Sequence, residues 1–215
     1  MDYFISDSHF GHRNIIKYCN RPWSTAEEMD NGMIQCWNSA VGQDDNVFVV
    51  GDMFLCDEDE AKDIMSRLNG YKILIAGNHD SRESKMLRVG FNEYHRELTY
   101  CLGDMGTALM KHYPQPDKVT TESGYDYLIH GHLHVPPHRD GLKINVAADL
   151  IDFTPVSRDY VLDSLGGSSS NSDNEIINLE SNDEKIKLSI EIRPEDFSGT
   201  IDHIYKLLRK QWRSK

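Results

Sequence analysis

Five apolar runs of this sequence each lead into a short polar motif, and this alternation limits how the chain can fold. The runs before the first three motifs are residues 3–5, 47–50 and 73–76. Segments with helical spacing of apolar residues separate these three runs, which predicts parallel strands joined by crossover helices. In such a sheet the carboxyl ends of the strands meet at one edge, where ligands bind. We therefore expect the polar motifs to converge at that edge.

The polar motifs supply carboxylates, imidazoles and one carboxamide. They are Asp7-Ser8-His9, Gly51-Asp52, Gly77-Asn78-His79-Asp80, a lone His112 and Gly131-His132-Leu133-His134. Alternate residues of an extended chain share a face, so Asp7 and His9 can bind one ion. His132 and His134 have the same spacing, although the turn at Gly131 would let them reach different ions. Each motif alone is a frequent coincidence, but together and in this order they predict a metal site.

A charge count favours two metal ions over one. Two divalent cations would bring about four positive charges against the two negative charges of Asp7 and Asp52, and the other ligands are neutral. Two ions about 3.5–4 Å apart can hold a bridging hydroxide and bind the oxygens of a phosphoryl group during in-line attack. The nitrogen and oxygen donors suit Mn²⁺, Fe, Zn²⁺ or Ni²⁺, and we expect Mn²⁺.

His79 is expected to have a catalytic role rather than a ligand role. It lies next to Asn78, and Asp80 follows at once as a carboxylate that could orient the imidazole. An imidazole near the leaving oxygen can donate a proton or stabilise developing charge. The alternative is that His79 only forms a hydrogen bond within its turn.

At this point the sequence resembles the calcineurin-like metallophosphoesterases. The family pattern D-x-H, G-D, G-N-H-[DE], H and G-H-x-H is matched at every element from Asp7 to His134. Residues 5–16 resemble a small bacterial and phage branch in particular, and Ser8 stands where many relatives have threonine. The resemblance covers about residues 1–160. It implies an α/β fold, a four-layer α/β/β/α sandwich of two mixed sheets flanked by helices, built around a dinuclear metal site.

The resemblance also implies roles for individual residues. One ion would be held by Asp7, His9, Asp52 and His134, and the other by Asp52, Asn78, His112 and His132. His79 would be the catalytic imidazole, supported by Asp80. His12 and Arg13 follow the first motif and are candidate substrate contacts, because a guanidinium can bind phosphate through two hydrogen bonds. The alternative for Arg13 is a surface position at the start of a helix.

The remaining pattern predicts three helices and a second sheet. Helices are expected over residues 14–19, over a segment that a capping box at 24–27 opens and that runs to about residue 40, and after a cap at Asp57. Short strands at 97–102, 107–111, 125–129 and 142–146 suggest a second, more antiparallel sheet packed on the first.

The chain is expected to have three parts. Residues 1–162 would form the metallophosphoesterase domain, and the Gly-, Ser- and Asn-rich segment within 163–184 predicts a flexible linker or long loop. Residues 185–215 would form a C-terminal strand–helix extension, either packed on the domain or separate. The helix expected from about residue 200 has a basic face, which we interpret as solvated, with a partner or nucleic-acid surface as the alternative.

Composition limits partners and location. The net charge of −12 argues against extended nucleic-acid binding, which needs a basic surface. Four scattered cysteines favour reduced thiols. No run reaches the roughly 20 apolar residues of a membrane helix, and no signal peptide is recognisable. We therefore expect a protein that acts on a small phosphorylated substrate and does not bind a membrane. We expect it in the cytoplasm, or in the host cytoplasm if it is phage-encoded.

These residues are compatible with three functions. The leading hypothesis is a dinuclear metal-dependent phosphoesterase, a phosphatase or phosphodiesterase, that hydrolyses a small and nucleotide-like phosphomonoester or phosphodiester by attack of a metal-bridging hydroxide. The first alternative is a metal-dependent nuclease acting on DNA or RNA. The second is a non-catalytic metal-binding scaffold, which would be expected to have lost ligands or the imidazole, whereas every position is present here.

Overall fold

The structure is a computed structural model that describes residues 1–166, 177–182 and 185–190. The chain divides into two compact units, residues 1–167 and 168–215. All five polar motifs belong to the first unit. The helix predicted from about residue 200 lies outside the described residues.

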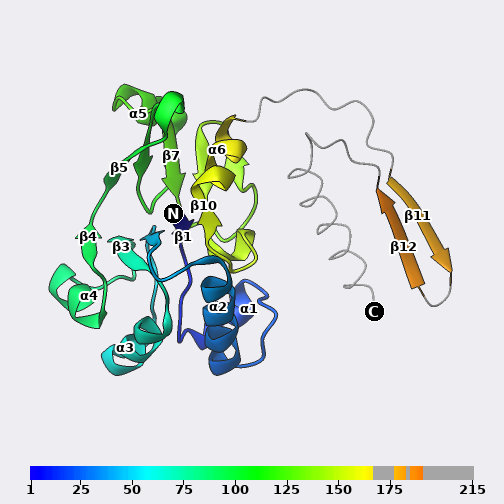
Figure 1. The fold of residues 1–215 in the computed structure, drawn as a ribbon, viewed down its shortest axis with the longest axis horizontal. Coiled ribbons are helices and arrows are strands. Elements are labelled where there is room, and N and C mark those ends of the chain that lie inside the picture. The colour runs from blue at the N-terminus through cyan, green and yellow to red at the C-terminus, as the bar shows by residue number, and fades with distance from the viewer. Residues whose placement is uncertain (167–176, 183–184, 191–215) are drawn as a thin grey trace. The chain divides into compact units, whose positions relative to one another are not determined.

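The first sheet has the strand order β10-β1-β2-β3-β4 (Figure 1). Its strands are β1 (Asp2–Ile5), β2 (Asn46–Val49), β3 (Tyr71–Ile75), β4 (Glu93–His95) and β10 (Val156–Ser157). Strands β1 to β4 are parallel, and β10 pairs antiparallel with β1. Helices fill the connections between the parallel strands: α1 (Arg13–Tyr18), α2 (Ala26–Ala40), α3 (Glu58–Arg67) and α4 (Glu83–Val89). This is the predicted crossover arrangement.

Side-chain caps begin two of these helices. The Asp57 carboxylate accepts hydrogen bonds from two backbone amides at the start of α3, as predicted. Helix α2 begins after Thr25, whose hydroxyl accepts the Glu28 backbone N–H at 3.1 Å. The Glu28 carboxylate in turn accepts the Ser24 backbone N–H, so the capping box lies one residue later than predicted. No helix of the described ranges is long and apolar enough to cross a membrane.

The second sheet has the order β5-β6-β7-β9-β8. Its strands are β5 (Leu98–Cys101), β6 (Thr107–Met110), β7 (Tyr127–His130), β8 (Arg139–Asp140) and β9 (Lys143–Asn145), with α5 (Asp117–Glu122) between β6 and β7. The two outer pairings are antiparallel, but β6–β7 and β7–β9 are parallel. The second sheet is therefore more antiparallel than the first, as predicted, but its centre is parallel because α5 makes the β6–β7 connection a crossover.

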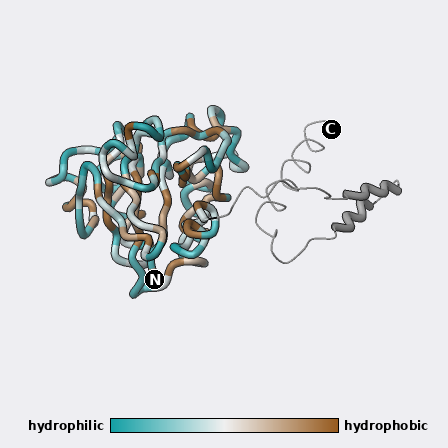
Figure 2. Tube along the Cα trace, turned by 90° about the horizontal axis from the view of Figure 1, so that it is seen from above, coloured by the Kyte–Doolittle hydropathy of each residue, from teal (hydrophilic) through white to brown (hydrophobic). Residues whose placement is uncertain are grey.

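Two apolar clusters hold these layers together. One lies between the sheets and joins Phe4 and Ile75 of the first sheet to Met110 and Ile129 of the second. Helix α6 (Arg158–Gly166) adds Val161 to it. The other cluster packs helices α1 to α4 against the opposite face of the first sheet. Hydrophobic segments alternate with hydrophilic ones along the chain (Figure 2). The predicted α/β sandwich of two mixed sheets is confirmed.

The second unit contains an antiparallel hairpin of β11 (Ile177–Asn182) and β12 (Lys185–Ile190). Strand β12 covers most of the strand predicted after residue 185. Strand β11 lies inside the segment 163–184, which was predicted to be a linker, and α6 runs past the predicted boundary at residue 162. Strand β11 was not predicted because its alternation, Ile177 and Leu179, is short and follows a Ser- and Asn-rich stretch. The functional division of the chain stays a prediction.

Candidate metal centre

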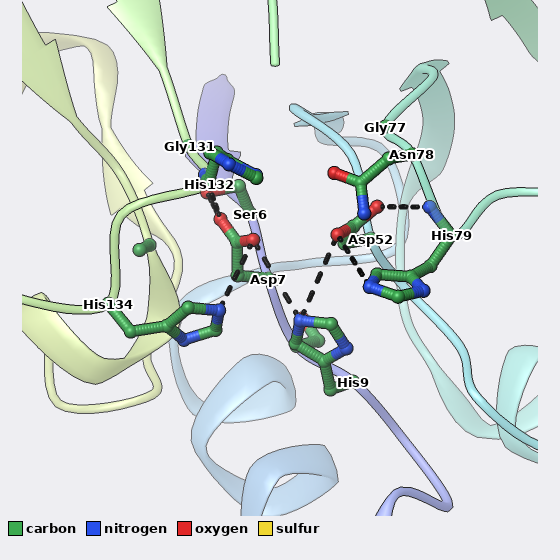
Figure 3. Close-up of polar contacts among 12 residues, drawn as sticks. Ser6, Asp7, His9, Asp52, Gly77, Asn78, His79, Gly131, His132 and His134 are labelled. Atoms are coloured by element: carbon green, nitrogen blue, oxygen red, sulfur yellow. Dashed lines mark hydrogen bonds and ion pairs between the residues drawn. The ribbon is translucent and has the colours of Figure 1, made fainter. Parts of the chain in front are cut away.

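The polar motifs meet where strands β1, β2 and β3 of one sheet and β6 and β7 of the other end (Figure 3). Four of the predicted ligands have left-handed backbone conformations: Asp7 (φ 54°), His9 (φ 51°), Asp52 (φ 55°) and His132 (φ 70°). Such a conformation costs a non-glycine residue about 1–3 kcal/mol and is typical of functional sites, where the surroundings impose it. The chain turns sharply at each motif, and these turns direct the side chains toward one another.

The first cluster consists of Asp7, His9 and His134. The Asp7 Oδ2 atom accepts hydrogen bonds from the Ser6 hydroxyl at 2.6 Å and the His132 backbone N–H at 2.8 Å. The Oδ1 atom is buried without a hydrogen-bond partner. It lies 3.6 Å from Nε2 of His134 and 3.9 Å from Nε2 of His9. A buried, unpartnered carboxylate oxygen facing two imidazoles is suited to a cation.

The second cluster consists of Asp52, His112 and His132. The Nδ1 atom of His112 lies 2.8 Å from the Val50 carbonyl, so it carries the proton in the neutral ring. This leaves the Nε2 lone pair facing Asp52 Oδ2 at 3.4 Å and Asn78 Oδ1 at 3.1 Å. A backbone carbonyl thus fixes the tautomer in which His112 can bind a metal.

Asp52 faces both clusters. Its Oδ2 atom lies 3.4 Å from Nε2 of His112 and 3.9 Å from Nε2 of His9. Tetrahedral ligands with bonds of about 2.1 Å are separated by about 3.4 Å, so both distances are close to those of a coordinated ion. The nitrogen and oxygen atoms present therefore fit two ions, one on each side of Asp52.

Burial and neighbouring charges shift the pKa values of the predicted ligands. Burial lowers the pKa of His9 to about 3, so its imidazole is neutral and can act as a ligand. Burial raises the pKa of Asp7, although His112 and the hydrogen bond from Ser6 act in the opposite direction. Burial also disfavours the charged form of His112, but the carboxylates of Asp52 and Asp7 outweigh it and raise the pKa of His112 to about 8.

His79 lies beside the centre and outside both clusters. Its side chain is 45 % exposed, and its Nε2 atom lies 3.9 Å from Asp52 Oδ2. Its backbone N–H donates to Asp52 Oδ1 at 2.9 Å (Figure 3). A hydrogen bond thus holds the backbone of His79 on a predicted ligand, while its imidazole is partly exposed.

Asp80 has other partners than expected. Its Oδ2 atom accepts the backbone N–H groups of Asp52 and Gly77, both at 2.8 Å, and its Oδ1 atom accepts that of Met53 at 3.2 Å. Burial raises its pKa despite these bonds. Asp80 therefore joins the loop after β2 to the loop after β3, and its expected support of the His79 imidazole stays a prediction.

The two predicted substrate contacts, His12 and Arg13, differ from each other in their position relative to the centre. His12 lies against the centre, because its ring centroid is 5.6 Å from that of His9. Its Nδ1 atom is buried and without a hydrogen-bond partner. Arg13 is exposed at the start of α1. Contact of either residue with a substrate stays a prediction.

Sequence reasoning missed a buried pair, Arg21 and Asp149, that supports the first cluster. Asp149 Oδ2 lies 2.7 Å from Nδ1 of His134. Arg21 donates to both Asp149 oxygens at 2.9 Å, and also to the carbonyls of Asp7 and Ser8. Arg21 thus connects the backbone of the first motif to a ligand of the last. The two residues are far apart in the sequence and match no motif, so no sequence signal identified them.

Cys19 also approaches His134 and Asp149, and these three could in principle hold a metal. Both Asp149 oxygens are already hydrogen-bonded, however, to Arg21 and His134. Burial raises the pKa of the Cys19 thiol to about 11, which disfavours the thiolate that a metal requires. This group supports the first cluster rather than forming a third site.

Two motif glycines leave room for the carboxylates. A Cβ atom added to Gly77 would overlap Asp52 Oδ1, and one added to Gly131 would overlap Asp7 Oδ2 and Ser6 Oγ. The glycines are therefore required by the close approach of the loops to the carboxylates.

Comparisons with known proteins identify the family of this chain. The family model of the calcineurin-like phosphoesterases matches residues 3–136. The chain is 35 % identical over 171 residues to the uncharacterized protein MJ1445 of Methanocaldococcus jannaschii, covering 74 % of this chain and 88 % of that protein. It is 29 % identical over 192 residues to the Gene 66 protein of Mycobacterium phage L5, covering 75 % and 92 %.

A solved structure is also similar. The crystal structure of AQ665, a protein of unknown function from Aquifex aeolicus, matches with a TM-score of 0.62 and 26 % identity, covering 75 % of this chain and 97 % of that one. The family match spans all five motifs, so both clusters lie within the matched residues. The chain belongs to the calcineurin-like phosphoesterase family.

Proposed function

We propose that this chain hydrolyses a small phosphomonoester or phosphodiester with two divalent metal ions, and that the substrate is nucleotide-like. The position of Asp52 carries the proposal. Its Oδ2 atom lies 3.4 Å from Nε2 of His112 and 3.9 Å from Nε2 of both His9 and His79. This carboxylate therefore faces an imidazole of each cluster and lies next to a third, partly exposed imidazole, that of His79.

The chain's own residues would hold the ions at fixed places. One ion would be bound by Asp7, His9, Asp52 and His134, and the other by Asp52, Asn78, His112 and His132. Two bound divalent ions supply Lewis-acid chemistry that activates water and neutralises phosphoryl oxygens. We expect Mn²⁺, while Fe, Zn²⁺ and Ni²⁺ suit the same donors.

His79 would donate a proton to the leaving oxygen of the ester. Its imidazole is 45 % exposed, so it can reach a bound substrate, and Asp52 fixes its backbone through a hydrogen bond of 2.9 Å. An imidazole placed next to the leaving oxygen can act as a general acid. Removing such a group costs about 10²–10⁴-fold in rate.

The test is hydrolysis of p-nitrophenyl phosphate and bis(p-nitrophenyl) phosphate by the Mn²⁺-loaded protein, with metal content measured in parallel. Asp52→Asn should lose both activity and bound metal. His79→Asn should lose at least about 100-fold in kcat and keep its metal. The matched control is His95→Asn on β4, where the imidazole pairs with Glu93 outside the centre. Metal-loaded wild-type protein that hydrolyses neither ester would contradict the proposal.

The nuclease alternative is tested in the same series. Single- and double-stranded DNA and RNA oligonucleotides are incubated with the Mn²⁺-loaded protein and separated on gels. The net charge of −12 disfavours a long polyanion, so we expect no cleavage under conditions where the nitrophenyl esters react.

A further inference from the structure

A pocket of about 380 Å³ lies on the side of His79 that faces helices α3 and α4. His79 and Asp80 form part of its wall, so the pocket and the metal centre share the His79 side chain. Small-molecule pockets span about 300–1,000 Å³, which places this one at the small end. Its size suits a compact organic group.

Part of the pocket wall is apolar and formed by core residues, while Asp57, Asp80 and Ser81 also line the pocket. Phe54, Ala61, Met86 and Val89 line it, and all four are buried. They also belong to the cluster that packs the helices against the first sheet. Because these side chains are fixed by the core, the pocket keeps its shape without a ligand. An apolar surface of this kind favours a ring system over a small polyol.

The rim carries a lysine that is available to a ligand. Lys85 lines the pocket from α4 and is half-buried. Its ammonium group forms no ion pair or side-chain hydrogen bond with residues in the described ranges, whereas Lys62 on α3 pairs with Glu58 and Lys118 on α5 with Glu122. A half-buried ammonium group at the rim can donate hydrogen bonds to acceptors of a bound molecule.

We propose that this pocket, called here the leaving-group pocket, receives the organic leaving group of the substrate. The occupant is a group of nucleoside size, with a ring face on Phe54 and Met86 and hydrogen-bond acceptors toward Lys85. The inference rests on the proposed function, because His79, the expected proton donor, forms the wall between the ester and the pocket. The bond from phosphorus to the leaving oxygen breaks, and that oxygen takes a proton from His79 and departs as an alcohol. The oxygen of water bonds to phosphorus, and a proton of that water restores His79.

The test compares adenosine 5′-monophosphate with glycerol 3-phosphate. Both esters release a primary alcohol, so their difference in kcat/KM reports how the body of the leaving group is bound. Leu55→Trp places a bulky ring at the rim, where Leu55 is 40 % exposed. It should lower kcat/KM for the adenosine ester about tenfold and leave the glycerol ester within about twofold. Lys85→Met should lower the adenosine value about tenfold, through the loss of a charged hydrogen bond. Lys118→Met is the matched control and should change neither.

A binding measurement separates the pocket from the chemistry. Adenosine alone is titrated calorimetrically into the Mn²⁺-loaded wild type and the Leu55→Trp variant. Binding to the wild type and not to the variant supports the pocket even if no ester is hydrolysed, in which case only the proposed function fails. The inference is overturned if adenosine does not bind, if Leu55→Trp binds it equally well, or if an active wild type shows no preference for the adenosine ester.

Discussion

Replacing Asp149 with asparagine should weaken the binding of one metal ion and leave the other in place. Asp149 accepts from Arg21 through both oxygens and contacts Nδ1 of His134 at 2.7 Å. This contact keeps the His134 ring turned so that Nε2 faces Asp7. An asparagine has nearly the same shape, but it loses the charge and presents an NH₂ group to one of these two donors. The His134 ring would then lose its fixed orientation.

The expected magnitude follows from two effects. Loss of a partner of a metal-bound histidine costs about 10–100-fold in metal affinity, or about 1.4–2.7 kcal/mol. Arg21 is buried and would keep its charge without its carboxylate partner, a change that typically costs about 3–5 kcal/mol of folding stability. Arg21 retains its hydrogen bonds to the carbonyls of Asp7 and Ser8. We therefore expect the loss of stability to lie at the lower end, about 3 kcal/mol.

Calorimetric titration with Mn²⁺ and thermal unfolding of the metal-free protein measure the two effects separately. The matched control is Asp152→Asn, because Asp152 is exposed and its φ of 49° is one that asparagine tolerates. Asp149→Asn should bind one ion as tightly as the wild type and the other about 10–100-fold more weakly. Two ions bound with unchanged affinity, or both weakened equally, would refute the assignment of Asp149 to the first cluster.

Three further predictions concern the same centre. Gly77→Ala should reduce bound Mn²⁺, measured by metal analysis, because the added Cβ overlaps the Asp52 carboxylate. The pKa of His112 is raised to about 8 from 6.5, so its protonated form stabilises the metal-free fold fully below pH 6.5 and this contribution is lost as pH rises through 8. Mn²⁺ binds only the neutral imidazole of His112. Calorimetry should therefore show that the affinity for Mn²⁺ rises, and that fewer protons are released on binding, as pH increases from about 7 to about 9. A chelator should lower the unfolding temperature, since an ion at 100 times its Kd stabilises by about 2.7 kcal/mol, and an unchanged temperature would indicate that no ion was bound.

The fold was predictable where local signals agree with the final structure. The apolar runs before the motifs form strands in the structure, and Asp57 caps α3, as predicted. The centre of the second sheet was not predictable, because the pairing of β6 with β7 depends on the crossover through α5 rather than on strand spacing. The strand β10 at Val156–Ser157 is too short to carry a pattern, and only its pairing with β1 defines it.

The motif residues could be placed together because each motif directly follows a strand and the strand ends meet at one edge. The expected alternation of an extended chain does not hold there, because Asp7 and His9 have positive φ angles. The residues that support these ligands could not be predicted. Arg21 and Asp149 are distant in the sequence, and only the folded chain brings them together at His134. The position of Asp80 next to His79 suggested a contact between their side chains, whereas the turn directs its carboxylate to the amides of Gly77 and Asp52.

Anomalous diffraction from crystals grown with Mn²⁺ tests the two-ion centre most directly. We predict two peaks about 3.5–4 Å apart. One should lie among Asp7, His9 and His134, the other among Asp52, His112 and His132, with the His79 ring bound to neither. A single peak, or a peak among Cys19, His134 and Asp149, would contradict a dinuclear centre that shares Asp52.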